Sequence, residues 1–264
     1  MRQFTPYLFL LLAASFLYSC KSAKLSDAEE KQRIGEYFEA AAIYRKVYTK
    51  TPPAKRDLRG YIAFRMAECN RLINNTPRAT SAYMNALRYK YPDSIVNLRL
   101  GQMYQKSGRY GEAVKYYNDY LLAEPGSVLA FNGVTGCEEA VKWKQSPTRY
   151  TVKRMDKFNS RRSEFSPMLY GEKYDQLYFA STRTPKGAGK DKEETNSAIT
   201  GQRNNDLFLV KQDENGAWLA PVELEDEVNT EFDEGTPSFS KDGNTMYYTC
   251  LLYTSPSPRD STSS

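Results

Sequence analysis

Histidine is absent from all 264 residues, so the chain lacks the side chain that most often serves as a general base or a metal ligand. Only two tryptophans and four cysteines occur, and no two cysteines have a CxxC or other metal-ligand spacing. No GxSxG nucleophile elbow is present in the sequence either. These absences favour a protein that is not an enzyme and that holds neither a metal nor a cofactor.

Tyrosine, by contrast, is abundant, and charge is distributed unevenly. There are 21 tyrosines, which suit the packing of repeated helices. Residues 21–162 hold 27 Lys and Arg against 14 Asp and Glu, whereas residues 163–264 hold 9 against 18. This split favours two domains with different surfaces. The basic half is either a set of solvated helix faces or a groove for an acidic peptide, a glycan or an envelope polymer.

The stretch LRLGQMYQKSGRYGEAVKYYNDYLLAEP, residues 98–125, predicts two amphipathic helices around a turn at residues 107–108. Small residues alternate with aromatic ones at spacings that place them on facing helix surfaces, where small side chains permit close approach. The stretch resembles a tetratricopeptide repeat, whose signature it matches in order at Leu98, Gly101, Tyr104, Gly108, Tyr110, Ala113, Tyr117 and Pro125.

Neighbouring repeats are expected because one helical hairpin cannot bury its own apolar face. Ala67, Ala79 and Tyr83 precede Gly101, Ala113 and Tyr117 by the length of one such repeat. An earlier copy of the pattern contains Gly35, Tyr37 and Ala40. About three repeats and a helix after residue 125 that covers the open end therefore predict an all-α solenoid over residues 24–147. Cys69 and Cys137 are expected to be small buried core residues that are too far apart for a disulfide.

The N-terminus has the features of a secretory signal, with Arg2 preceding an apolar run that is too short to span a bilayer comfortably. The run ends in Leu-Tyr-Ser-Cys at residues 17–20, which resembles a bacterial lipobox. This resemblance implies a signal peptide over residues 1–19 and a lipid on Cys20, and Lys21 then favours the outer membrane. The alternative is an ordinary signal peptide that happens to contain a cysteine.

From residue 163 the apolar period changes from that of helices to that of strands. Residues 148–162 form a basic linker, and strands are expected at 166–170, 176–181 and from 206. Residues 231–249 then restate the first hairpin, because Pro237 and Tyr247 follow Pro167 and Tyr178 at almost the same interval. A repeated hairpin is typical of propeller blades or of successive parts of a sandwich.

The sequence SFSKDG with MYY, residues 238–248, resembles the WD40-like repeat of periplasmic TolB-type propellers, with its hairpin turn at Asp242 and Gly243. This resemblance implies an incomplete all-β propeller over residues 163–250, consisting of one blade and the start of the next. The polar insertion at residues 185–205 is either a solvated loop or a binding loop. The Ser- and Pro-rich residues 251–264 are expected to be a non-native tail.

A lipobox, tetratricopeptide repeats and a WD40-like propeller occur in this order in OmpA-family outer-membrane lipoproteins of Bacteroidota, some of which belong to the type IX secretion and gliding apparatus. The resemblance implies a multidomain, non-enzymatic periplasmic scaffold, anchored in the outer membrane, whose solenoid and propeller hold envelope proteins. Peptidoglycan would be bound only through a further C-terminal domain, and no nucleic acid is expected. The alternatives are a fragment of a propeller-gated peptidase or hydrolase and a glycan-capturing outer-membrane lipoprotein.

Overall fold

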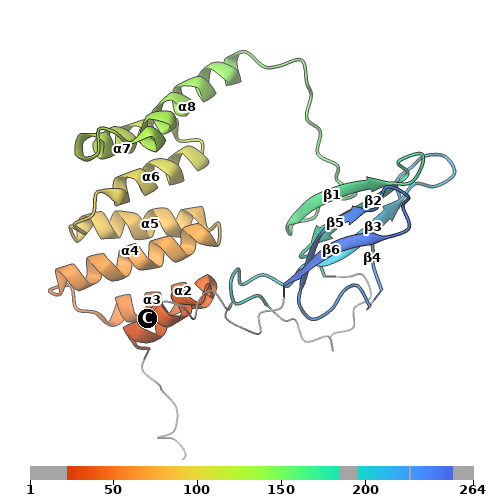
Figure 1. Ribbon diagram of the computed structural model, residues 1–264. Helices are drawn as coiled ribbons and strands as arrows, with labels where there is room; N and C mark the ends of the chain where they lie inside the picture. The colour runs from red at the N-terminus through yellow and green to blue at the C-terminus, as the bar shows by residue number, and fades with distance from the viewer. Residues whose placement is uncertain (1–22, 185–195, 226, 252–264) are drawn as a thin grey trace, which may run out of the picture.

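The computed structural model describes residues 23–184, 196–225 and 227–251 (Figure 1). Among the described residues seven helices come first, and they stack as three antiparallel pairs and one final helix into an all-α solenoid (Figure 1). Their bounds are α2 (Leu25–Arg33), α3 (Tyr37–Lys50), α4 (Arg56–Leu72), α5 (Thr76–Arg88), α6 (Ile95–Lys106), α7 (Tyr110–Ala123) and α8 (Val128–Gln145). We call residues 25–145 the helical unit. Each helix contacts the next along the chain, as expected of stacked repeats.

One tyrosine ring accounts for the close approach of three helices. The ring of Tyr117 on α7 lies between Gly101 on α6 and Gly133 on α8. A Cβ added to Gly101 would lie 2.6 Å from the Tyr117 ring, and one added to Gly133 would lie 2.5 Å from it. Only glycine therefore fits at these two positions. The ring is also held at its far end, where the Tyr117 hydroxyl donates a hydrogen bond to Gln105 at 2.6 Å.

A largely buried ion cluster lies inside the helical unit. The Glu68 carboxylate pairs with Arg71 at 2.8 Å and with Arg99 at 3.2 Å, and it accepts a hydrogen bond from the Tyr83 hydroxyl. Burial disfavours the charged carboxylate, but the hydrogen bonds from Arg71 and Tyr83 and the two positive charges outweigh burial and lower the pKa of Glu68. The cluster thus ties α4 to α5 and α6.

The two cysteines of the helical unit are buried free thiols. Cys69 is 0% exposed and Cys137 is 1% exposed, as the sequence predicts. Burial raises the pKa of Cys69 to about 12, so its thiol stays protonated at physiological pH.

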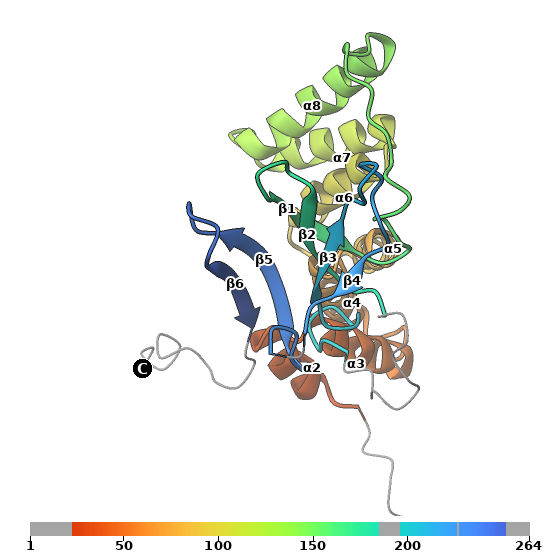
Figure 2. The same cartoon turned by 90° about the vertical axis from the view of Figure 1, so that its right-hand side faces the viewer.

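A second unit follows, the β unit of residues 164–251. Strands β1 (Glu164–Tyr170), β2 (Gln176–Ser181), β3 (Asp206–Lys211) and β4 (Val222–Glu223) form an antiparallel sheet in the order β1-β2-β3-β4. Strands β5 (Asp233–Phe239) and β6 (Met246–Leu251) form a separate antiparallel pair. Strand β5 contacts β1, β2 and β3, so the pair lies across one face of the larger sheet (Figure 2).

The two hairpins share an irregularity at matching positions. The β1–β2 register shifts between Phe165 and Met168, and the β5–β6 register shifts at the equivalent place, between Gly235 and Ser238. Ser166 and Thr236, each followed by a proline, both have φ +52°. Because proline has no N–H to donate to a ladder, a bulge is where a strand accommodates it.

The pairing beyond the first bulge corrects one strand boundary. Strand β1 begins at Glu164, ahead of the predicted start at residue 166, because pairing with β2 resumes on the far side of the bulge at Phe165 and Glu164.

The hairpin turns also correspond. Gly243 has φ +73°, and Tyr174, at the corresponding place in the first hairpin, has φ +52°. Asp242 accepts hydrogen bonds from the Ser240 hydroxyl at 2.6 Å and the Asn244 amide at 3.2 Å, which fixes the second turn. The Tyr170 hydroxyl donates to the Gly243 carbonyl at 2.7 Å, so strand β1 meets the turn of the second hairpin.

A short turn from the β unit contacts the start of α3. The Phe38 amide donates to the carbonyls of Ala198 and Ile199 at 3.2 and 3.0 Å, and the Phe38 ring lies where a Cβ on Gly201 would be. The first amides of a helix have no partner within it, so these carbonyls act as an N-cap supplied by the other unit. The C-terminal part of the polar insertion therefore lies against the first helical hairpin (Figure 1).

Three predictions fall on residues outside the described ranges. They are the signal peptide with lipidation of Cys20, the first part of the insertion (residues 185–195), and residues 252–264 of the predicted tail. Leu251, the predicted start of that tail, is instead the last residue of β6, where it pairs with Asp233. Within the described residues, no helix combines the length and the apolar character needed to cross a bilayer.

Candidate functional site

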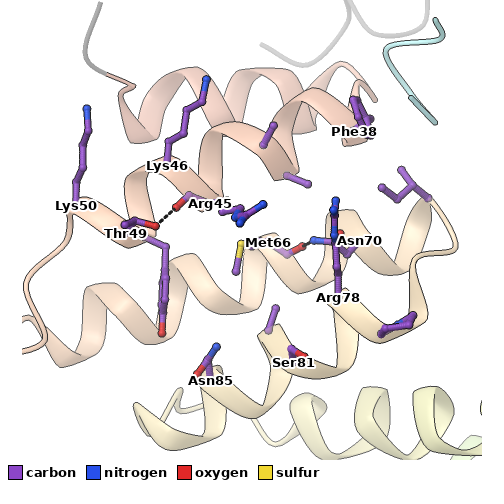
Figure 3. Close-up of a pocket in the computed structure, with 16 residues that line it drawn as sticks. Phe38, Arg45, Lys46, Thr49, Lys50, Met66, Asn70, Arg78, Ser81 and Asn85 are labelled. Carbon is purple, nitrogen blue, oxygen red and sulfur yellow. Dashed lines mark hydrogen bonds between the residues drawn. The ribbon is translucent and has the colours of Figure 1, made fainter. Parts of the chain in front are cut away.

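The candidate site is a cleft of about 920 Å³ between α3 and α5, with α4 forming its floor (Figure 3). Its volume lies in the range of ligand-binding clefts. We call it the α3–α5 cleft, and its lining residues are Phe38, Ala41, Ala42, Arg45, Lys46, Tyr48, Thr49, Lys50, Met66, Asn70, Ile73, Pro77, Arg78, Ser81, Ala82 and Asn85.

Small side chains keep the α3–α5 cleft open. Ala41 on α3 and Ala82 on α5 are 8% and 2% exposed, so they lie within the packed body of the unit and leave the space between the helices unfilled. Met66 and Ile73 of the α4 segment add apolar surface to the lining. The cleft therefore combines an apolar base with room for an extended chain.

The charge of the lining is of one sign. Four of the sixteen lining residues are cations, Arg45, Lys46, Lys50 and Arg78, and none carries a carboxylate. Among the residues that the structure describes, no ion pair within 4.0 Å involves any of these four side chains. A cleft lined in this way attracts anionic groups and repels cationic ones.

Polar uncharged groups accompany the cations. Asn70 is 5% exposed, and its side-chain amide donates to the Met66 carbonyl at 2.8 Å (Figure 3). The Thr49 hydroxyl donates to the Arg45 carbonyl at 2.9 Å in the same view. Ser81 and Asn85 follow each other at helical spacing along α5. Amides and hydroxyls of this kind form hydrogen bonds with the backbone of a bound peptide.

One end of the α3–α5 cleft is fixed by the β unit. Phe38, which lines the cleft, donates its backbone amide to the carbonyls of Ala198 and Ile199. The cleft end thus depends on both units, so the linker at residues 148–162 is not their only connection.

The predicted repeat-packing residues lie outside the lining of the cleft. Most are buried, and Ala40, Ala67, Ala79, Tyr83 and Ala113 are 0% exposed. Leu98, Tyr104 and Tyr117 are 4%, 9% and 2% exposed. Tyr37 is the first residue of α3, and Tyr110 is the first residue of α7. In the turns before these two helices, Gly35 has φ +88° and Gly108 has φ +71°. Pro125 follows α7 and is exposed.

The sequence did not predict which residues line the cleft. The only sequence property that indicated it is the excess of Lys and Arg in residues 21–162, which did not say which cations would lie together. Arg45 and Arg78 belong to different helical pairs, and only the stacking of α3 beside α5 brings them to one surface.

The described residues form no metal site, and their two tryptophans lie in different units. Within residues 23–184, 196–225 and 227–251, no group of three or more Cys, Asp and Glu side chains is arranged to hold a metal ion. The two tryptophans do not share one surface, because Trp143 is 67% exposed on α8 while Trp218 packs edge-on against Phe158 in the β unit.

Comparison with known proteins gives structural similarity alone. No protein-family model matches the chain, and no curated protein matches its sequence. Among solved structures, MamA is similar to this chain with 16% identity and a TM-score of 0.39, and the match covers 49% of this chain and 77% of MamA. The C-terminal TPR-containing domain of a putative Plasmodium falciparum FK506-binding protein has 16% identity and a TM-score of 0.41, with 48% of this chain and 92% of that domain covered. The Sgt2 TPR domain from Aspergillus fumigatus has 16% identity and a TM-score of 0.39, with 54% of this chain and 93% of that domain covered. Similarity at this level does not say what the chain binds.

Proposed function

We propose that this protein is a non-enzymatic scaffold and that the α3–α5 cleft holds an extended acidic segment of a protein partner. The observation that supports the proposal is the lining of the cleft, in which four cations and no carboxylate surround an apolar base. Acidic side chains of the partner would lie near Arg45 and Arg78, and small apolar ones would contact Met66 and Ile73.

The cleft suits an extended peptide better than a compact small molecule. It is open, its cations come from two helices, and hydrogen-bonding groups such as Asn85 and Ser81 are spread along its length. Exposed charges raise the association rate and the specificity of binding more than they raise the affinity. We therefore expect salt-sensitive binding of moderate affinity.

A peptide titration tests this proposal. A labelled twelve-residue peptide that alternates Glu with Leu should bind the full chain, whereas the same peptide with Lys in place of Glu should not. The variant Arg45→Glu/Arg78→Glu is expected to weaken binding by about tenfold or more, because two attractions become repulsions. Fluorescence anisotropy at two salt concentrations measures both effects.

Lys55→Glu/Lys115→Glu is the matched control, because both side chains are exposed on the helical unit and neither lines the cleft. It changes the net charge by the same amount and should alter affinity by less than about twofold. Equal loss of binding in the two variants, or equal binding of the Lys peptide, would refute an acidic-peptide cleft.

We also propose that the scaffold is anchored in the outer membrane through a lipid on Cys20. The support is the Leu-Tyr-Ser-Cys sequence at residues 17–20 after a short apolar run, and these residues lie outside the described ranges. A lipid anchor with several chains holds a protein on a membrane without a spanning helix.

Metabolic labelling with a palmitate analogue should mark the wild-type chain and should fail to mark Cys20→Ala. After a high-salt wash, which removes electrostatic binding, the Cys20→Ala variant should also leave the outer-membrane fraction on density separation, with Cys69→Ala as a cysteine control that keeps the label. A variant at Cys20 that still carries the label, or that still sediments with the outer membrane after the high-salt wash, would refute this anchor.

We propose further that the β unit is part of a WD40-like propeller in a scaffold of the OmpA-family kind, a group that includes type IX secretion and gliding components. The four-stranded meander β1–β4 has the strand order of a propeller blade, and β5–β6 repeats its first hairpin with the same bulge. In this proposal the propeller holds further envelope proteins beside the helical unit. The fragment experiment in the Discussion tests it.

A further inference from the structure

A second surface with strong binding chemistry lies where the helical unit ends. Residues 141–157 contain six Lys and Arg against one Asp, and every residue in this range is exposed. We call this range the basic segment. It comprises the last turn of α8 and the first part of the extended linker toward β1 (Figure 1). The four cations that begin it are Lys142, Lys144, Arg149 and Lys153.

Large apolar side chains are interleaved with these cations. Trp143 is 67% exposed, Tyr150 72%, Val152 96% and Met155 49%. Neither the helical unit nor the β unit covers them, although both units have packed cores elsewhere. Isolated exposed apolar residues are ordinary, but four within residues 143–155, interleaved with cations, are typical of a segment that binds a surface.

We propose that the basic segment binds the surface of an anionic lipid bilayer. Lys and Arg lie near the negatively charged headgroups, with their aliphatic stems along the apolar boundary. Trp and Tyr favour the headgroup level, where one part of the ring is apolar and the other polar, while Val152 and Met155 bury aliphatic surface. The segment thereby sets the helical unit beside the membrane independently of any lipid on Cys20 and of what the α3–α5 cleft binds.

The composition favours lipid over single-stranded nucleic acid. Proteins that hold single-stranded nucleic acid without sequence preference combine aromatic rings on which successive bases stack with a groove that follows the backbone. Here two of the four apolar side chains are aliphatic, and the segment after residue 145 has no regular secondary structure that would hold rings at base spacing.

Few charged or polar groups contact the cations of the basic segment. Arg154 pairs with Asp156 at 3.0 Å, the only acidic residue of the segment, and Lys157 donates to the Trp218 carbonyl at 2.8 Å. Lys142 pairs with Glu139, which lies one helical turn earlier on α8. The Arg149 guanidinium lies 5.3 Å from the ring of Tyr150. Since Lys142 and its partner are both on the exposed surface of α8, the cation remains within reach of a headgroup.

Vesicle binding by the full chain tests the proposal. Co-sedimentation is measured with vesicles of phosphatidylcholine alone and with vesicles in which phosphatidylglycerol replaces part of it, each at low and high salt. The apolar N-terminal run contributes equally to vesicle binding by all variants. The readout is therefore the binding that depends on anionic lipid and is lost at high salt. Each Lys or Arg near an anionic surface raises the membrane partition coefficient about fivefold. The variant Lys142→Gln/Lys144→Gln/Arg149→Gln/Lys153→Gln should therefore weaken binding to anionic vesicles by more than about a hundredfold.

Two further variants make the result specific. Lys55→Gln/Arg88→Gln/Lys90→Gln/Lys115→Gln removes the same charge from exposed sites on the helical unit and should leave anionic binding within about threefold of wild type. Trp143→Ser/Val152→Ser should weaken binding by about tenfold and abolish the blue shift of tryptophan emission on adding vesicles, with the salt dependence retained.

Three results would overturn the proposal. They are equal loss of binding in the two charge variants, equal binding of wild type to neutral and anionic vesicles, and tighter binding of a short oligothymidylate than of anionic vesicles. The last result would assign the basic segment to single-stranded nucleic acid instead.

Discussion

Gly101→Ala is expected to destabilise the helical unit, although alanine favours helix formation more than glycine does. The new Cβ would lie 2.6, 2.7 and 2.9 Å from three carbons of the Tyr117 ring. The ring cannot shift away, because Gly133 occupies its other side. Overpacking costs about 1–3 kcal/mol, whereas the gain in helix propensity is about 1 kcal/mol, so we expect a net loss of up to about 2 kcal/mol. Urea unfolding followed by the helical circular dichroism signal measures it.

Gly111→Ala provides the matched control, since Gly111 lies in α7 and a Cβ there meets nothing within 4 Å. It should be neutral or stabilising by up to about 1 kcal/mol. Adding Gly133→Ala to Gly101→Ala should cost more than the two single changes together, because the ring is then blocked on both sides. Equal stabilities for Gly101→Ala and Gly111→Ala would mean that Tyr117 does not pack against α6 as described.

Separated halves of the chain are expected to differ completely in folding. A fragment of residues 24–150 contains consecutive helical pairs with mostly local contacts and should melt cooperatively with a helical spectrum. A fragment of residues 160–250 should be poorly folded or aggregate. In it, β6 pairs with β5 alone among the described strands, and Tyr247 and Tyr248 are 63% and 37% exposed on β6. Uncovered edges and apolar strand faces favour association between chains.

The melting transition and the oligomeric state of each fragment are measured by circular dichroism and analytical ultracentrifugation. Aggregation of the second fragment would fit a propeller that needs further blades to bury these faces. A monomeric β fragment with a cooperative transition would contradict the propeller proposal and favour a self-contained sandwich.

The helices could be predicted from sequence because their cause is local. The alternation of small and aromatic residues recurs at the period of a tetratricopeptide repeat, and each recurrence gives a helical pair whose buried face the pattern identifies. The positions at which Tyr117 meets Gly101 follow from one repeat alone. That the same ring also contacts Gly133 requires the next helix, whose sequence departs from the repeat signature.

The strand pairs were also predicted, since apolar alternation and turn residues mark them. Their exact extent was not, because the bulge at residues 165–168 lets β1 continue through a proline. The contact between Phe38 and the turn at residues 198–201 could not be foreseen. It joins residues that are distant in the sequence through backbone carbonyls, which carry no side-chain pattern.

The candidate site was the least predictable part. Its cations come from α3 and α5, and whether they share a surface depends on how successive helical pairs stack. A basic composition is equally compatible with scattered solvated faces. Only the arrangement in space distinguishes the two alternatives.

Whether the α3–α5 cleft is the partner-binding surface is tested most directly by chemical-shift mapping during titration with the acidic peptide. Binding there should shift the side-chain amides of Asn70 and Asn85 and the methyl group of Met66, which line the cleft. The amides of α7, which is not part of the lining, should stay unchanged. Shifts confined to α7, α8 or the β unit, with the amide of Asn70 unaffected at saturation, would contradict the proposed function.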